Sequence, residues 1–265
     1  MTKRKKQILN IISRVIIMVS FIAISAFLII YASGYQINFK ARIVEKTGII
    51  VVKSDPSAEL HVNNKSRGKT PSRLMFLPKG IYHLRLQTPQ YKNWEKTIVL
   101  NSEEYIKIDT VLFLDQPKIQ EFGVNDNVSS FQEFGQKFSE MDSKEQAEIS
   151  LPPDAKDVLI NRADKEIIYR TEYEIWTQSF LTSNANNEDD RKIISRQQNP
   201  ISKIFYYPDF EHILYVCDNK LYVVELSGIN NTFLVNVDDP NVKITANGKK
   251  ILINQKGISF VVTVR

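Results

Sequence analysis

The sequence has one cysteine, three histidines and nine glycines in 265 residues, and each scarcity excludes a kind of site. A lone Cys217 cannot form an intramolecular disulfide, a cysteine-rich zinc site or an iron–sulfur cluster, and we expect it to be structural. The sequence has no HxxxH-type metal pair, GxSxG elbow, glycine-rich phosphate loop or SxxK motif. It therefore predicts no catalytic residue, no metal site and no cofactor.

The remaining titratable residues give no catalytic pattern either. We expect His61 and His83 to be exposed on strands and His212 to be an ordinary surface residue in a turn. The adjacent acids Asp189-Asp190 and Asp238-Asp239 suit loops better than a cleft with two facing carboxyl groups. The chain is therefore expected not to be an enzyme. The alternative is an extracytoplasmic hydrolase of cell-wall glycans, whose acids are brought together by folding.

The excess of positive charge is confined to the N-terminus. Five cations and no acid occur in the first fourteen residues, namely Lys3, Arg4, Lys5, Lys6 and Arg14. The rest of the chain carries 30 basic and 30 acidic side chains, from totals of 35 and 30. A neutral body lacks the counterion release that drives binding to a phosphate backbone, and no basic stripe with interleaved aromatics is present. Nucleic acid is therefore not an expected partner.

A long apolar segment follows the basic residues and predicts a membrane helix over residues 8–32. Residues 15–32 are uncharged and would form about 27 Å of helix, close to the ~30 Å of a bilayer core. The positive-inside rule places the basic tail, residues 1–7, in the cytoplasm and residues 36–265 outside. A cleaved signal peptide is the alternative, because Ala32-Ser33-Gly34 resembles a cleavage site. The apolar run is longer than the usual 7 to 15 residues, which favours an anchor in the cell membrane.

Residues 36–114 are predicted to form a small antiparallel β-sandwich. Short alternating apolar runs, among them 48–52, 59–62 and 82–86, are separated by turn signals such as Asn63-Asn64 and residues 68–71. Six short strands are expected between Gly48 and Leu114, which is enough for two packed sheets.

The turns of this region resemble the PEGA domain, a small β-sandwich of bacterial and archaeal cell surfaces. The residues that carry the resemblance occur in the family's order: Pro56, Ala58, Gly68, Thr70, Pro71, Pro78, Gly80, Tyr82, Tyr91 and Trp94. The Pro-Glu-Gly-Ala signature is reduced to Pro56-Ser57-Ala58, and Gln90 replaces the glycine that usually precedes the later tyrosine. The resemblance implies a bacterial surface protein in which this module is a spacer or adhesive unit without enzymatic activity.

Positive charge is also concentrated in the predicted sandwich. Residues 36–114 carry 13 basic and 7 acidic side chains, which favours proximity to anionic lipid or wall polymer within a Debye length of about 8 Å. Four cations in the middle of the region are the candidate contacts, namely Lys65, Arg67, Lys69 and Arg73.

Residues 115–150 are predicted to be an acidic, partly helical linker. The spacing of Val128, Phe131, Phe134, Phe138 and Met141 would place an apolar stripe on one face of a helix. We expect these side chains to dock on a neighbouring domain, although a partner-binding peptide would show the same pattern.

Residues 151–265 contain three similar stretches, which begin at Val158, Ile204 and Val242, at offsets of 46 and 38 residues. Each predicts three strands with polar turns between them, which is typical of β-propeller blades. The stretch Tyr207–Tyr215 also resembles repeats of periplasmic and surface propellers. Closed propellers need four to eight blades. Either residues 115–150 hide a degenerate copy, or the arc is incomplete and another chain completes it.

The repeats also predict which side chains are buried, because one small sheet cannot cover both of its own faces. Stacked neighbours would bury Phe205, Tyr215, Trp176 and Phe260 in the core. The polar loop 183–190 lacks the alternating ligands and glycine of a calcium loop, so a solvated loop is expected.

The sequence as a whole predicts a mainly β, single-pass membrane protein. A transmembrane helix, a PEGA-like sandwich and a propeller-like repeat region would form a structural or binding module at the cell surface. A protein partner or a second copy is compatible with this organisation. A membrane-bound sensor subunit is a further alternative, although the seven residues before Ile8 are too few for an output domain.

Overall fold

The computed structural model describes residues 3–32, 34–38, 43–123, 127–137, 140, 149, 151–161, 165–179 and 191–265. Within these ranges, the side chains of residues 3–11, 30–32, 36–38, 43–44 and 136–137 are outside the description. The chain divides into two compact units. The first comprises Met1–Leu86 with Lys96–Thr110, and the second comprises Gln87–Glu95 with Val111–Arg265. The expected sandwich range, 36–114, therefore contributes to both units.

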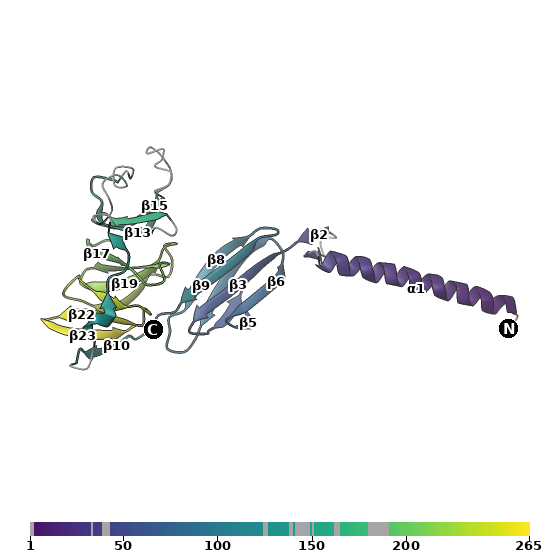
Figure 1. Cartoon of the computed structure of the whole chain (residues 1–265), viewed down its shortest axis with the longest axis horizontal. Coiled ribbons are helices and arrows are strands. Elements are labelled where there is room, and N and C mark those ends of the chain that lie inside the picture. Colours follow the sequence, from purple (N-terminus) through teal and green to yellow (C-terminus); the bar gives the residue numbers. More distant parts are fainter. Residues whose placement is uncertain are drawn as a thin grey trace. The chain divides into compact units, whose positions relative to one another are not determined.

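One long helix precedes the β structure (Figure 1). Helix α1 spans Lys3–Ala32, so it begins within the basic residues and not at Ile8 as expected. Lysine, arginine and glutamine are good helix formers, which explains the earlier start. The short strands β1 (Tyr35–Asn38) and β2 (Ile43–Lys46) then pair antiparallel with each other.

The predicted sandwich is present in the first unit, with seven strands and not six (Figure 1). One sheet has the order β6-β3-β9 and the other the order β5-β4-β7-β8. The strands are β3 (Gly48–Asp55), β4 (Glu59–Val62), β5 (Lys65–Lys69), β6 (Ser72–Leu77), β7 (Gly80–Gln87), β8 (Trp94–Leu100) and β9 (Tyr105–Val111).

Alternating burial explains the sandwich. Ile50 and Val52 of β3 and Leu84 and Leu86 of β7 are buried, whereas Lys53 and His83 on the opposite faces are exposed. Both Asn63 and Asn64 adopt positive φ, as the predicted tight turn requires. The predicted turn over 68–71 is wrong at its start, because Gly68 and Lys69 belong to β5. All five residues of β5 are exposed and none is apolar with a side chain, so no apolar alternation marked this edge strand.

The second unit contains three stacked antiparallel sheets, one for each predicted repeat (Figure 1). Their orders are β12-β13-β14-β15-β16, β17-β18-β19-β20 and β10-β23-β22-β21-β11. No closed barrel or propeller is formed by the described residues. The repeat strands are β13 (Lys156–Asn161), β14 (Glu166–Arg170), β15 (Glu174–Ser179), β16 (Lys192–Arg196), β17 (Ile201–Tyr206), β18 (His212–Cys217), β19 (Lys220–Glu225), β20 (Thr232–Asn236), β21 (Lys243–Thr245), β22 (Lys250–Gln255) and β23 (Ile258–Thr263).

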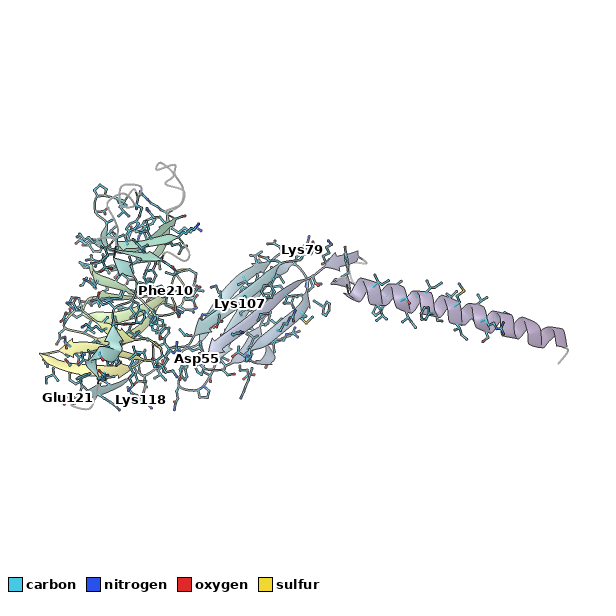
Figure 2. All side chains as sticks on the ribbon, viewed as in Figure 1. Asp55, Lys79, Lys107, Lys118, Glu121 and Phe210 are labelled. Atoms are coloured by element: carbon cyan, nitrogen blue, oxygen red, sulfur yellow. The ribbon has the colours of Figure 1, made fainter. Side chains whose placement is uncertain are left out.

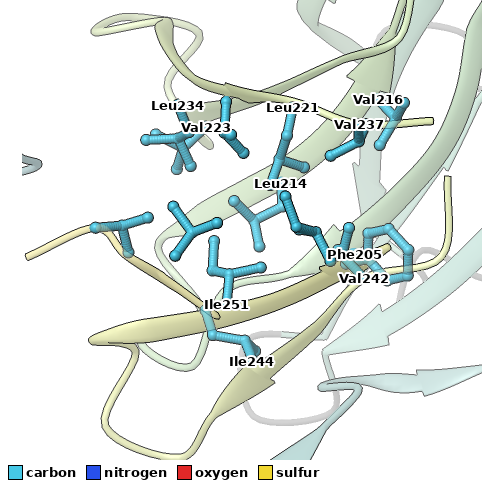
Figure 3. Close-up of a cluster of buried hydrophobic side chains, with 14 of the residues drawn as sticks. Phe205, Leu214, Val216, Leu221, Val223, Leu234, Val237, Val242, Ile244 and Ile251 are labelled. Atoms are coloured by element: carbon cyan, nitrogen blue, oxygen red, sulfur yellow. The ribbon is translucent and has the colours of Figure 1, made fainter. Parts of the chain in front are cut away.

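The middle sheet is covered on both faces. On one face, Leu214 and Val216 of β18 pack with Ile251 of β22 in the cluster of Figure 3. On the other, Ile213 and Tyr215 pack with a cluster that includes Ile168 of β14. All six residues of β18 are consequently buried.

The aromatic residues expected in the core are buried to different extents. Phe205 and Tyr215 lie in the core, as predicted. Phe260 is half-buried at the margin of the cluster with β22 and β23, and Trp176 is half-buried on β15.

The helix predicted from Val128 to Met141 is wrong in the described part of that segment. It forms the 3₁₀ turn η1 (Val128–Ser130) and two short strands, β11 (Phe131–Gln132) and β12 (Gln136–Lys137). Phe138 and Met141 lie outside the described residues. The open edges of two sheets offer unpaired backbone groups, and strand pairing with them replaces the local helix.

The short strands of the predicted linker, residues 115–150, complete sheets whose other strands come from later in the chain. Strand β10 (Lys118–Glu121) pairs with β23, and β11 pairs with β21 of the same sheet. Strand β12 instead pairs with β13 of another sheet. Phe134, between β11 and β12, packs against both core clusters. We call residues 131–137 the strap, because they join the edges of the two outer sheets.

Candidate functional site

Helix α1 is the first candidate functional element. Within it, residues Ile12–Ile29 are long and apolar enough to cross a membrane, and none of these side chains is buried by the protein. Arg14 is exposed near the start of this window, where its side chain can reach lipid headgroups. The side chains of Lys3, Arg4, Lys5 and Lys6, which set the predicted topology, lie outside the described residues.

Hydrogen bonds join the residues just after α1 to the base of the sandwich. The Thr47 backbone N–H and hydroxyl both donate to the Gly34 carbonyl, at 3.1 and 2.6 Å. The Glu103 N–H in turn donates to the Thr47 carbonyl, and Lys46 Nζ pairs with the Glu103 carboxylate at 2.6 Å. Lys46 Nζ also lies 5.7 Å from the ring centroid of Tyr35.

The four candidate cations lie on two edge strands of the sandwich. Lys65, Arg67 and Lys69 are on β5, and Arg73 is on β6, the edge strand of the other sheet. All four are exposed, and none has an acidic partner in the described part of the chain. Strands β5 and β6 follow each other in the chain and contact each other, so the four charges lie along one side of the sandwich.

The first group of motif residues forms a buried hydrogen-bonded turn. The Thr70 hydroxyl accepts from the Ala58 N–H at 2.9 Å and shares a 2.6 Å hydrogen bond with Ser54 Oγ. The Thr70 N–H donates to the Ala58 carbonyl at 2.8 Å, and Pro56 and Pro71 flank these two strand ends. These residues therefore join the two sheets at the end of the sandwich where β3 and β5 finish.

The remaining motif residues of the first unit form a second turn. The Tyr82 hydroxyl donates to the Pro78 carbonyl at 2.7 Å, and Gly80 begins β7 between them. Burial raises the pKa of Tyr82, an effect that the nearby Arg67 opposes.

The motif residue Gly68 lies on β5, outside this turn. It has a φ of +88°, a conformation that favours glycine.

Tyr91 and Trp94 belong to the second unit and pack there. Trp94 is buried and its Nε1–H donates to the carboxylate of Glu225 at the end of β19. The same carboxylate accepts from Asn230 Nδ2 at 2.8 Å, and Asn230 exchanges hydrogen bonds with the backbone of Glu95. Tyr91 forms a β-bridge with Leu114. The sequence patterns did not single out Glu225, because its partner is 131 residues away.

The expectation that His212 is a surface residue is wrong. Its side chain is buried and its Nδ1 lies 2.8 Å from Asp209 Oδ2. The ring makes edge contacts with Phe113 and Tyr207. Of the other two histidines, His83 is exposed as expected, whereas His61 is half-buried.

A second polar network lies between Tyr215 and neighbouring side chains. The Tyr215 hydroxyl is within hydrogen-bond distance of both amide atoms of Asn231, at 2.7 and 2.9 Å, and accepts from Gln197 Nε2 at 3.0 Å. Its ring stacks on Tyr222 with 5.1 Å between centroids. Burial raises the pKa of Tyr215 to about 12.

The adjacent acids Asp238 and Asp239 and the thiol of Cys217 are hydrogen-bonded to the protein backbone. Asp239 accepts from the Asn241 N–H at 2.9 Å, which lowers its pKa, and Asp238 accepts from the Lys256 N–H. Cys217 is buried, its thiol donates to the Asn199 carbonyl, and burial raises its pKa. Among the described residues, no group of three or more His, Cys, Asp or Glu is placed to hold a metal ion. Residues 183–190, expected to be a solvated loop, and Asp189-Asp190 lie outside the described residues.

The described residues define a mainly β protein with one apolar N-terminal helix, a seven-stranded sandwich and three stacked sheets. Residues 47–115 match the family described as PEGA domain, which confirms the resemblance over about a quarter of the chain. A solved structure described as "KlHsv2 with loop 6CD replaced by a Gly-Ser linker" aligns over 64% of this chain and 70% of that chain. The sequence identity between the two chains is 10% and the TM-score is 0.24. No curated protein matches the chain.

Proposed function

We propose that this chain is a single-pass membrane protein with its N-terminus in the cytoplasm and its β units outside. The observation that carries the proposal is the unburied apolar surface of α1, together with the PEGA match that begins at residue 47. An isolated helix with this much exposed apolar surface would aggregate in water, whereas lipid covers it. Five cations before the apolar window favour a cytoplasmic N-terminus.

The retention of α1 is tested on the full chain with a C-terminal tag, expressed in a bacterial host. The tagged protein should stay in the membrane pellet after an alkaline carbonate wash, and its mass should include residues 1–33. A washed-off protein whose N-terminus lies close to Gly34 would instead establish the second candidate, a cleaved signal peptide.

The role outside the membrane is proposed to be structural or binding, not catalytic. The PEGA-like sandwich would act as a spacer, and the three-sheet unit as a propeller-like platform for a protein partner or a second copy. In the described residues of the platform, Tyr173 in the turn between β14 and β15 and Ile193 on the edge strand β16 are each 42% exposed. Such side chains are available to a partner.

The rival activity is hydrolysis of cell-wall glycans, which needs two carboxyl groups about 5 to 10 Å apart across a cleft. Asp238 and Asp239 are engaged by turn backbone and do not support it. Release of soluble sugar from purified cell wall by the full chain, lost on substitution of one acid, would establish the hydrolase and overturn the binding role.

Contact of the sandwich with an anionic surface is a separate part of the proposal. A soluble fragment of residues 34–265 should adsorb to vesicles with phosphatidylglycerol at low salt. Replacing Lys65, Arg67, Lys69 and Arg73 by glutamine should weaken adsorption, whereas replacing the paired Lys46 and Lys107 should have less effect. Equal adsorption of all three proteins would remove the four cations from the proposal.

A further inference from the structure

Exposed apolar side chains gather at one end of the sandwich. Among the described residues of the first unit outside α1, the exposed large hydrophobic side chains are Met75, Ile81, Val99 and Tyr105. Each lies within two positions of a strand terminus: the end of β6, the start of β7, the end of β8 and the start of β9. Three of the four are 59–62% exposed. We call these four residues the collar.

The collar occurs on both outer faces of the sandwich. Ile81 and Val99 are on β7 and β8 of one sheet, and Met75 and Tyr105 are on the edge strands β6 and β9 of the other. In each strand the neighbouring residue is more buried, as with Leu100 beside Val99. The collar residues therefore point away from the core, and they do not stabilise the sandwich by burial.

The strand termini of the collar are the ones that the backbone ties to the end of α1. Gly48 pairs with Leu77 at the end of β6, and the Ile49 N–H donates to the Glu104 carbonyl just before β9. The carbonyl of Thr47, the residue before β3, accepts a hydrogen bond from the Glu103 N–H. The Thr47 N–H donates to the carbonyl of Gly34, two residues after α1 ends. Figure 2 shows Lys79, which precedes β7, at this end of the sandwich and Asp55 at the opposite end.

The charges around the collar suit a headgroup region. Lys79 is exposed and has no acidic partner in the described part of the chain. Two of the acids there are engaged, since Glu103 pairs with Lys46 and Glu104 accepts from the Asn101 N–H at 2.6 Å. Tyrosine and lysine beside aliphatic side chains are typical of a membrane–water interface.

We infer that the collar is a lipid-docking surface, which inserts into the outer interface of the bilayer that α1 crosses. The inference rests on the proposed function, because it needs α1 to remain as a span. If α1 ends at the outer interface, the hydrogen bonds from Gly34 to Thr47 and from Thr47 to Glu103 hold the collar beside the headgroups. The aliphatic groups of Ile81 and Val99 then enter the acyl boundary, and the occupant of the surface is a phospholipid bilayer.

The test uses single nitroxide labels on the full chain, reconstituted in nanodiscs of phosphatidylethanolamine and phosphatidylglycerol. Cys217 is first replaced by serine, which keeps its hydrogen-bond donor. Separate proteins carry Y105C, K107C and D109C, three exposed positions that follow the same face of β9 over about 13 Å. Further labels at Ile81 and Val99 report the other sheet, and one at Ile22 reports the middle of α1. Power saturation compares collisions with oxygen, which partitions into lipid, and with a water-soluble nickel chelate.

The oxygen-to-nickel collision ratio should be several-fold higher at positions 105, 81 and 99 than at position 109, with position 107 intermediate. A high ratio at Ile22 with equal, water-like ratios at 105, 107 and 109 would overturn the collar and leave the membrane span intact. A water-like ratio at Ile22 would overturn the proposed span itself, and the collar with it. Circular dichroism of each labelled protein checks that the sandwich is still folded.

Discussion

The sandwich and the three-sheet unit differ in how many faces of a sheet are buried. In the sandwich each sheet has one covered face, so burial alternates along β3 and β7 and the outer faces carry charged residues. In the three-sheet unit the middle sheet lies between two others, and β18 has no exposed residue. A strand of the first kind tolerates change at every second position, whereas a strand of the second kind tolerates little anywhere.

The largest expected effect separates these two kinds of strand. Ile213→Ala and Leu214→Ala remove neighbouring side chains from opposite clusters, and each should lower the free energy of unfolding by about 2–5 kcal/mol. In β9 of the sandwich, Ile108→Ala should have a cost in that range, but Lys107→Ala only about 0–1 kcal/mol, since it loses one surface ion pair. Denaturant unfolding with peptide-resolved hydrogen exchange measures each unit. A cost below about 1 kcal/mol at either β18 position would contradict burial on both faces.

A second effect tests the strap of the three-sheet unit. Gly135 has a φ of +92°, and a Cβ there would collide with the ring of Tyr206. Gly135→Ala should cost about 1–2 kcal/mol for the backbone and a further ~1–3 kcal/mol for the collision. Gly68→Ala in the sandwich is the matched control, because its φ is +88° but open space surrounds it. Thermal unfolding should rank Gly135→Ala as more destabilising, and the reverse order would show that the strap does not pack on β17.

A third effect concerns the buried turn of the sandwich. Thr70→Val keeps the shape of the side chain but leaves the Ala58 N–H without its hydroxyl acceptor, and should cost about 1–3 kcal/mol. Thr70→Ser retains the hydroxyl and should recover most of that loss. Equal stabilities of the two variants in urea unfolding would mean that the hydroxyl does not hold the turn.

The smallest effect depends on pH and belongs to the three-sheet unit. A folded-state pKa of about 12, above the usual value of 10, means that Tyr215 stabilises the folded state fully below pH 10 and loses this contribution as pH rises to about 12. Tyr215→Phe should cost about 1 kcal/mol at pH 8 through lost hydrogen bonds. The difference between the two proteins should shrink and then change sign between pH 10 and 12, because only the protein with Tyr215 loses stability as this hydroxyl ionises. A constant difference across that range would exclude Tyr215 as the source.

Much of the fold could be predicted from local sequence. The three repeat strands around Ile167, Ile213 and Ile251 are present as β14, β18 and β22, because β-branched runs between polar turns have few alternatives. The turn at Asn63-Asn64 was predictable for a similar reason, since asparagine tolerates positive φ.

What failed was non-local. Phe131 and Phe134 have helical spacing, but the residues around them pair as strands with β21 and β13. These partner strands lie 20 to over 100 residues away in the sequence. His212 was expected at the surface because Glu166 and Lys250 occupy its place in the other two repeats, yet Phe113, from outside the repeat, covers it. The collar was not predicted from the sequence. Side chains alternate along β7, so Ile81 is on the face of the sheet that Leu84 and Leu86 do not occupy. Its exposure, however, depends on how both sheets pack and not on this strand alone.

Helix α1 is proposed to stay attached and to span the bilayer, with both β units outside. Protease treatment of spheroplasts tests it most directly, on a full chain that carries one epitope tag before Lys3 and another after Arg265. The C-terminal tag should be lost, while the N-terminal tag should survive in a membrane-bound fragment that contains α1. Survival of the C-terminal tag in spheroplasts, with its loss only after the membrane is broken, would show that the β units lie in the cytoplasm.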